Sequence, residues 1–240
     1  MFLFDDFRDN LIIDRYDVGF LAMRGSKTDS MRSENSEDAL TWNVFRSLAQ
    51  VDPAFWLPRI FRHGFGGELD GSARSIGVRL WQRVQPPPAL QPYQRDEGES
   101  EIDVLIETEQ LVWFIEAKFR SDVSERTTNN PDRDQVIRNL DVGSWYAGVR
   151  DFYFSLLLMD APQVTKGTAL VERYAGSADE VSRRVPHRPD RLANLRGVSV
   201  LRWSQLASVF SQCASNAPRD DERAYARRAA EWLKDRKIAG

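Results

Sequence analysis

Three charged residues in the middle of the chain could together bind a hard metal ion. Asp103 lies in the segment 102–107, and Glu116 and Lys118 lie in a second segment, 111–119, that follows closely. Side chains alternate along a strand, so Glu116 and Lys118 share one face. If the connecting loop has an even number of residues, Asp103 lies directly across from Glu116, with Cβ atoms about 5 Å apart. An odd loop would separate the two acids.

Two carboxylates held this close need compensation, because like charges directly opposed in a sheet are destabilising. The neighbouring Leu105 and Phe114 are apolar, which indicates covered strands and not a surface ribbon. The acids therefore either share a proton or bind a divalent cation such as Mg²⁺ or Mn²⁺, and Lys118 adds one positive charge. The alternative is an ordinary cross-strand charge cluster in which Lys118 faces and neutralises Glu101.

A third carboxylate comes from the helix predicted at 36–49, for which Ser36 is a suitable N-cap. Its apolar residues form one stripe, at Leu40, Val44 and Leu48. Glu37 lies three positions before Leu40 and falls on the same stripe, so it is the best candidate for completing a magnesium-type site. Two neighbouring acids are its substitutes, Asp38 and Glu34. The alternative role of Glu37 is to complement the helix N-terminus.

The remaining segments describe an α/β protein. We predict strands at 76–84, 102–107, 111–119, 152–159 and 198–201, and helices at 36–49, from about Pro131 to Tyr146, at 204–210 and at 221–237. Residues 52–75 are rich in Gly and Pro, and we read them as a loop that begins where Pro53 ends the first helix. The closing helix is expected to bury Tyr225, Ala229 and Trp232. This order predicts a mixed central sheet flanked by helices, in a single domain over 1–240.

The composition excludes several kinds of site. The chain has 240 residues, a net charge of −3, one cysteine and two histidines. Cys213 alone cannot form an internal disulfide or a multi-cysteine zinc site, and His63 and His187 are too far apart in sequence to suggest a histidine metal cluster. No segment approaches the ~18 apolar residues of a membrane span, and the acidic first residues do not resemble a signal peptide. We expect a cytoplasmic protein.

Basic charge is concentrated near the C-terminal third of the chain. The segment 183–202 carries six arginines and one aspartate, hence +6 − 1 = +5, against −3 for the whole chain. Such an asymmetry is typical of a local anion-binding surface. The arginines proposed to bind nucleic acid are Arg183, Arg184, Arg188 and Arg191. The alternative is a solvated, arginine-rich loop.

The order and spacing of these residues resemble the active-site signature of the PD-(D/E)XK nuclease superfamily, also called restriction-endonuclease-like. The signature is Asp103, then Glu116-Ala117-Lys118 thirteen residues later, after a helix that bears Glu37. The resemblance covers about residues 30–160. Ile102 replaces the proline that usually precedes the first acid. Gln135 matches a glutamine that many members carry in the next helix, although Tyr146 lies farther from it than the tyrosine that often accompanies this glutamine.

The resemblance implies a restriction-endonuclease-like fold and a role for each residue. Asp103 and Glu116, with the carbonyl of Ala117, would hold Mg²⁺ or Mn²⁺, and Lys118 would position and help deprotonate the attacking water. Glu37 would take a second metal or an outer-sphere water, and Gln135 would orient substrate or water.

The implied function is metal-dependent cleavage of DNA in prokaryotic restriction, phage defence or repair, by a homodimer or within a larger complex. Strandedness, sequence preference and a choice of RNA are left open. One alternative is a catalytically silent member that binds nucleic acid or a partner protein. Another is an unrelated α/β domain with a structural charged hairpin.

Overall fold

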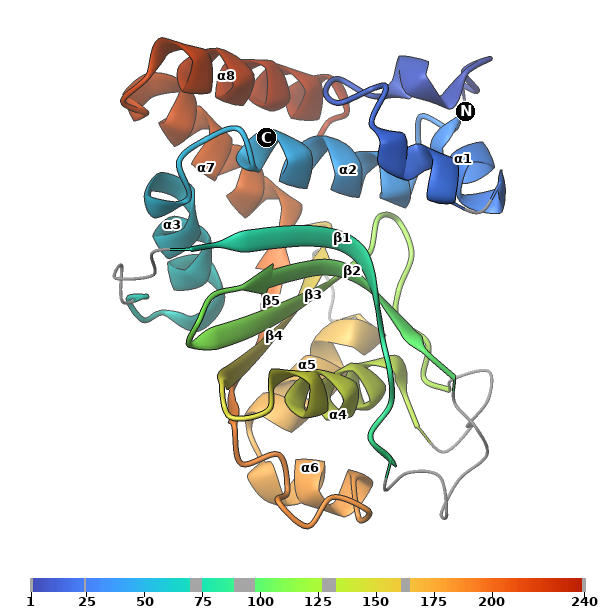
Figure 1. Ribbon diagram of the computed structural model, residues 1–240, viewed down its shortest axis with the longest axis vertical. Coiled ribbons are helices and arrows are strands. Elements are labelled where there is room, and N and C mark those ends of the chain that lie inside the picture. Colours follow the sequence, from blue (N-terminus) through green and yellow to red (C-terminus); the bar gives the residue numbers. More distant parts are fainter. Residues whose placement is uncertain are drawn as a thin grey trace. The chain divides into compact units, whose positions relative to one another are not determined.

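The computed structural model describes residues 2–23, 25–69, 75–88, 98–126, 133–160 and 165–238. Its α-helices and strands are labelled in Figure 1. The chain divides into two compact units. The first, Met1–Gly71 with Arg202–Gly240, is called the helical unit, and the second, Ser72–Leu201, is called the sheet unit.

The helical unit is built around buried helices. Its elements are the 3₁₀ helices η1 (Phe7–Asn10) and η2 (Val18–Ala22) and the α-helices α1 (Gly25–Met31), α2 (Glu37–Leu48), α3 (Pro53–Phe65), α7 (Trp203–Asn216) and α8 (Asp220–Asp235). The predicted helix 36–49 corresponds to α2, and Ser36 caps it by accepting a 3.1 Å hydrogen bond from the Ala39 N–H. Large side chains with essentially no exposure form the core, among them Phe45, Trp56, Trp203 and Phe210.

Helix α3 corrects the prediction of a loop over 52–75. Asp52 caps this helix by accepting a 2.9 Å hydrogen bond from the Ala54 N–H, and Pro53 occupies the first helical position. Proline is well tolerated there, because the N–H that it lacks would have no helical partner. The helix ends before Gly66, whose left-handed φ of 71° is typical of a glycine that follows a helix. Pro53 therefore begins a helix here, and the glycine marks its end.

Helix α8 has a different buried face from the one predicted. Ala229 is buried as expected, but Tyr225 is 41% exposed and Trp232 is only partly buried. The buried stripe consists of Glu222, Ala226, Ala229 and Leu233. Both stripes have helical spacing and share Ala229, so periodicity alone does not distinguish them.

The sheet unit contains one five-stranded sheet in the order β1-β2-β3-β4-β5. Its strands are β1 (Gly77–Val84), β2 (Ser100–Glu107), β3 (Leu111–Ala117), β4 (Asp151–Leu158) and β5 (Leu195–Arg202), and its helices are α4 (Gln135–Ala147), α5 (Lys166–Ala175) and α6 (Ala178–Arg184). The pairs β1–β2 and β2–β3 are antiparallel, and β3–β4 is parallel. The predicted mixed sheet flanked by helices is confirmed, with α4 and α5 packed on its strands.

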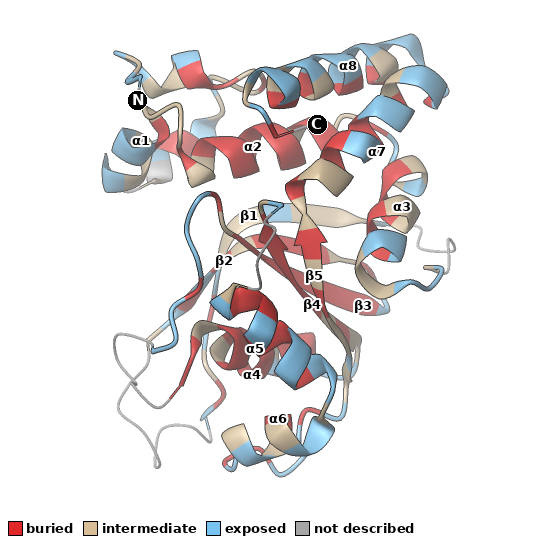
Figure 2. Ribbon diagram, turned by 180° about the vertical axis from the view of Figure 1, so that it is seen from behind, coloured by how far each residue is buried: buried red, intermediate tan, exposed pale blue. Residues whose placement is uncertain are grey.

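The hairpin register agrees with an even loop. Val104 pairs with Ile115 and Glu107 pairs with Val112. The loop closes through a 2.9 Å hydrogen bond from the Thr108 N–H to the Leu111 carbonyl. Every residue of β3 is buried, as Figure 2 shows, so its two faces are both covered. A charged side chain on this strand must therefore be compensated inside the fold.

Within the described residues, helix α4 begins at Gln135, whereas the predicted start was at about Pro131. Asp134 is its N-cap and accepts a 2.9 Å hydrogen bond from the Ile137 N–H, while Pro131 lies outside the described residues. The helices α5 and α6 fall in a region for which no helix was predicted. In the part of the chain described, no helix is both long and apolar enough to cross a membrane.

Candidate active site

Asp103 and Glu116 lie at the point where β2 and β3 diverge. They are one step beyond the last paired residues, Val104 and Ile115. Asp103 Oδ2 accepts a 2.9 Å hydrogen bond from the Ala117 N–H, the residue that follows Glu116. The side chain of Asp103 thus reaches the backbone at the end of β3, next to Glu116 in the sequence, and the predicted pairing of the two acids as a metal site stays a prediction.

Glu116 is 5% exposed and accepts hydrogen bonds from three side chains. Its Oε1 atom lies 2.8 Å from Lys118 Nζ and 2.5 Å from Gln135 Nε2. Its Oε2 atom accepts a 2.9 Å hydrogen bond from Asn139 Nδ2. A buried ionised carboxylate is costly unless it is both paired and hydrogen-bonded, and this one has both kinds of partner.

Lys118 therefore balances the charge of Glu116, the acid two residues before it. Lys118 extends from the end of β3, where its N–H donates a 2.8 Å hydrogen bond to the Leu157 carbonyl of β4, and its side chain is 13% exposed. The β3–β4 pairing fixes the backbone from which Lys118 projects. Asp103, Glu116 and Lys118 together carry a formal charge of −1, so the cluster can still accept a cation.

Asn139 is a site residue that the sequence analysis missed. It lies one turn after Gln135 on α4, and residues four apart share a helix face. The two amides consequently reach the same carboxylate from one helix. The pattern of two amide side chains at this spacing, in a helix that follows the Glu-Ala-Lys strand, was visible in the sequence and could have identified Asn139.

Glu37 belongs to the helical unit, whereas the four residues just described belong to the sheet unit. It is the first residue of α2, is partly exposed, and follows the N-cap Ser36. This placement agrees with the predicted helix start. Its contribution to a metal centre stays a prediction.

The side of α4 away from Glu116 is held by a second group of charges. Asp141 is fully buried and interacts with Arg133 Nη2 at 2.9 Å, His187 Nε2 at 2.7 Å and Arg188 Nη1 at 3.0 Å. Burial alone would raise the pKa of Asp141, but the hydrogen bond with His187 and the charge of Arg133 outweigh burial and hold this pKa below its ordinary value. Asp141 is thus a charged anchor inside the fold.

Asp134 anchors the start of the same helix. Its Oδ2 atom accepts a 2.5 Å hydrogen bond from the Tyr174 hydroxyl and lies 3.2 Å from Arg184 Nη2. Burial, followed by the hydrogen bond to Asp134, raises the pKa of Tyr174 to about 12. Asp134 and Asp141 are seven positions apart, which places them on one stripe of α4, distinct from that of Gln135 and Asn139.

These contacts change the interpretation of the predicted arginine cluster. Arg188 is 6% exposed and also pairs with Asp190 at 2.7 Å, so it stabilises the interior and is not available to a nucleic acid. Arg184 is partly buried against Asp134. Arg183 forms an ion pair with Glu180, and Arg191 is exposed. A shared anion-binding surface that includes Arg188 is therefore wrong, because net charge along a segment does not reveal which side chains are buried.

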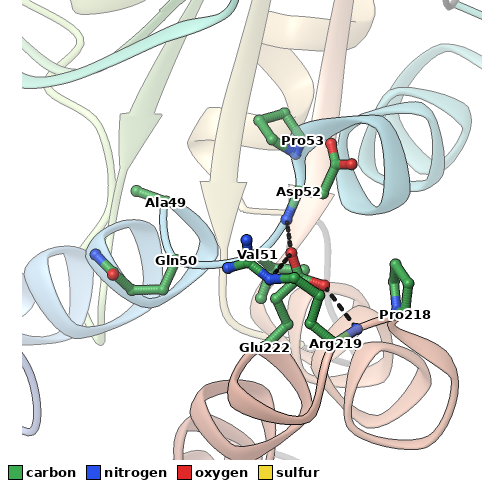
Figure 3. Close-up of a pocket in the computed structure, with 8 residues that line it drawn as sticks. All are labelled: Ala49, Gln50, Val51, Asp52, Pro53, Pro218, Arg219 and Glu222. Atoms are coloured by element: carbon green, nitrogen blue, oxygen red, sulfur yellow. Dashed lines mark hydrogen bonds and ion pairs between the residues drawn. The ribbon is translucent and has the colours of Figure 1, made fainter.

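A cavity of about 350 Å³ in the helical unit lies between the starts of α3 and α8 (Figure 3). Glu222, which is 3% exposed, accepts hydrogen bonds from the Asp52 N–H at 3.2 Å and the Arg219 N–H at 3.3 Å. One carboxylate thus satisfies backbone donors at two helix starts. The acid in this cavity is engaged in holding the helices together.

Among the described residues, no three His, Cys, Asp or Glu side chains form a group that could hold a metal ion. Within that part of the chain, Asp103 and Glu116 therefore have no third ligand of these types beside them. Comparison of the chain with protein-family models, curated proteins and solved structures finds no match.

Proposed function

We propose that the chain is a Mg²⁺- or Mn²⁺-dependent nuclease of the PD-(D/E)XK type that hydrolyses phosphodiester bonds in DNA. One observation carries this proposal. The Asp103 carboxylate accepts a hydrogen bond from the N–H of Ala117, which lies between Glu116 and Lys118 in the sequence, and Lys118 Nζ lies 2.8 Å from Glu116 Oε1. The resemblance in order and spacing supplies the choice of reaction and of DNA as substrate.

The residues present fit a hard cation. Carboxylate oxygens are the ligands that Mg²⁺ and Mn²⁺ prefer, and each carboxylate offers about four lone pairs. Glu116 uses three of these sites for Lys118, Gln135 and Asn139. Asp103 and Glu116, with the carbonyl of Ala117, would hold the ion. When bound, such an ion polarises the phosphate and lowers the pKa of a bound water.

Lys118 supplies charge in this mechanism. An ammonium group has three N–H donors and no acceptor, and in the structure one of them is directed at Glu116. In the proposed reaction Lys118 would position the attacking water, and its charge would oppose the negative charge that develops on phosphorus-bound oxygens. Lys118 can accept the proton of the water only after it has itself lost a proton.

Gln135 and Asn139 hold Glu116 in place with neutral donors. A neutral amide fixes the orientation of a carboxylate without cancelling its charge, so the acid keeps its attraction for a cation. We assign these two residues a positioning role. Glu37 is proposed, from the resemblance alone, to serve a second metal or an outer-sphere water.

The test is a cleavage assay on supercoiled, linear and single-stranded DNA with Mg²⁺, Mn²⁺ or a chelator. Lys118→Ala is compared with Lys166→Ala, a matched control whose side chain is 61% exposed and pairs with Glu125. We expect metal-dependent cutting by the wild type and the control, and loss of cutting in Lys118→Ala. Cutting that persists in Lys118→Ala or in chelator would overturn the proposed mechanism.

Metal binding is measured separately, by calorimetric titration of Mn²⁺ without DNA. Asp103→Asn removes the charge of the acid and keeps its shape. We expect weaker Mn²⁺ binding in this variant, by tenfold or more. Equal affinity in the variant and the wild type would place the ion elsewhere and end the proposal for this pair.

A catalytically silent binding module is the second candidate function. The observation in its favour is that Lys118 already neutralises Glu116, and both oxygens of that acid accept hydrogen bonds. Such a closed cluster is stable without a metal. This candidate predicts DNA binding that is unchanged in Lys118→Ala, with no cutting of any substrate.

A further inference from the structure

Four cations near the end of the described chain are exposed and have no partner within it. We call them the α8 cations, and they are Arg227, Arg228, Lys234 and Lys237. Other exposed cations in both units pair with an acid, as Arg62 does with Glu68 at 2.9 Å and Arg196 does with Asp151 at 2.6 Å. The α8 cations are therefore available to an anion from outside the chain.

The segment 223–237 keeps a positive charge after its internal contacts are counted. It carries six cations and two acids, hence +6 − 2 = +4, against −3 for the whole chain. Arg223 pairs with Asp220, and Arg236 donates to a backbone carbonyl of the N-terminal segment. The four α8 cations remain, against the two acids of the segment, so the exposed side stays positive.

The helix dipole accounts for only part of this charge. Acids near the start of a helix and cations near its end are stabilising, and the effect falls off within one turn of each end. Helix α8 has three acids in its first turn and Lys234 in its last turn. Arg227 and Arg228 are the eighth and ninth of its 16 residues, so the dipole gives no reason for them.

Ion pairing along the helix does not account for the two arginines either. Glu231 lies four residues after Arg227 and three after Arg228, which are the spacings at which helix side chains can pair. In the described structure Glu231 is exposed and pairs with neither. Exposed pairs of this kind are weak in any case, so Glu231 would compete little with a phosphate group.

The α8 cations suit a polyanion with regularly spaced charges. Arg227 and Lys234 are seven residues apart, so they lie in one row about 10 Å long on the exposed side of α8, which Figure 2 shows. Proteins hold the nucleic-acid backbone through lysine and arginine contacts of this kind. The planar guanidinium of arginine matches phosphate oxygens especially well.

An anionic membrane is a poorer partner for this helix. A helix that lies on a membrane presents large apolar residues to the lipid. In α8, all of which is described, Ala226, Ala229 and Leu233 are buried in the fold, and Tyr225 is the one large apolar side chain that is exposed, at 41%. The exposed side therefore offers charge without an apolar face.

We propose that the α8 cations bind the phosphate backbone of the DNA substrate. This inference rests on the proposed function and gives the substrate a second contact surface, on the helical unit. Contacts with phosphates hold a nucleic acid without reading its bases, so the surface would bind DNA of any sequence.

The test measures binding of a labelled DNA duplex by fluorescence anisotropy, in chelator so that nothing is cut, at several salt concentrations. The α8 variant combines Arg227→Gln, Arg228→Gln and Lys234→Gln. The control combines Arg62→Gln, Lys166→Gln and Arg196→Gln, which change the net charge equally at side chains that are 60%, 61% and 52% exposed but paired.

The expected result is a change in salt dependence. The logarithm of the binding constant falls with the logarithm of salt concentration, by a slope of about 0.9 for each phosphate contact on duplex DNA. Three lost contacts should make the slope shallower by roughly 2.7 in the α8 variant, whereas the control should keep the slope of the wild type. Equal slopes in the wild type and the α8 variant overturn the inference.

A second measurement requires no variant to fold. Lysines of the wild type are acylated with and without bound DNA, and the modified peptides are quantified by mass spectrometry. DNA should protect Lys234 and Lys237 but not Lys166, the paired and exposed control. Equal acylation of Lys234 with and without DNA counts against the surface, as does loss of binding to phosphatidylserine vesicles in the α8 variant with DNA binding unchanged.

The two proposals fail separately. Metal-dependent cutting by a wild type whose DNA binding does not depend on the α8 cations removes only the surface. DNA binding that depends on the α8 cations, without cutting of any substrate, removes only the nuclease.

Discussion

Replacing Arg188 by methionine separates the two interpretations of the arginine-rich segment. Arg188 Nη1 donates 3.0 Å hydrogen bonds to the carbonyl and to Oδ1 of Asp141, and Nη2 donates to Ser144 at 3.2 Å. Removing one partner of a buried ion pair costs about 3–5 kcal/mol. Arg133 and His187 remain on Asp141, so we expect the lower end, about 3 kcal/mol of unfolding free energy.

The assay is urea denaturation followed by circular dichroism, together with hydrogen exchange of the α4 amides. The control is Arg191→Met, at an exposed arginine, where a surface substitution changes stability by at most about 0.5 kcal/mol. A loss of ~3 kcal/mol is a large share of the ~5–15 kcal/mol that stabilises a typical domain. Faster exchange should therefore be seen along α4 in Arg188→Met only.

The opposite result has a definite meaning. If Arg188→Met unfolds at the same urea concentration as the wild type and instead weakens DNA binding, the arginine acts at the surface. The buried cluster around Asp141 would then be misinterpreted, and with it the account of how α4 is held against the sheet.

Four further outcomes are expected. The free energy of unfolding, measured by urea denaturation, should fall by about 2–3 kcal/mol between pH 10 and 12. The reason is that Tyr174 has a pKa of about 12 in the folded chain and 10.0 in the unfolded chain. The variant Tyr174→Phe should not show this fall. Gly143→Ala should destabilise by about 1–3 kcal/mol in the same assay, since its Cβ would lie 2.1 Å from a Phe152 ring carbon. Glu222→Ala should lose about 2 kcal/mol in thermal unfolding, as two helix starts lose a cap. Asn139→Ala should weaken calorimetric Mn²⁺ binding about tenfold without unfolding the chain, and unchanged affinity would exclude a positioning role.

The hairpin and its acids were predictable because the information is local. Strand side chains alternate, so an even loop between segments 102–107 and 111–119 places Asp103 across from Glu116, and only the choice between an even and an odd loop was left open by the sequence. Gln135 was found by its place in the next helix. Asn139 needed only the additional step of reading one turn further along the same face.

The ion pairs that hold α4 through Asp134 and Asp141 were not predictable in this way. Arg188 and Asp141 are 47 residues apart, and only the folded chain brings them together. A cluster of arginines has the same composition whether it lies on the surface or pairs with buried acids, so its net charge could not reveal that Arg188 is buried. Helix α3 was missed for a different reason, since Pro53 and Gly66 serve as helix boundaries and were read as loop residues.

The two faces of α4 have different partners, and both affect the position of Glu116. One face offers Glu116 the neutral donors of Gln135 and Asn139, and the other is tied down through Asp134 and Asp141. If further cations, and not amides, held Glu116, the cluster with Asp103 and Lys118 would lose its charge of −1 and its attraction for a metal ion. Placing the additional positive charge of Arg184 and Arg188 behind the helix holds the amides in position while leaving the acid charged. In the proposed nuclease, Arg184 and Arg188 would thus contribute to the site by fixing the helix and not by binding the substrate.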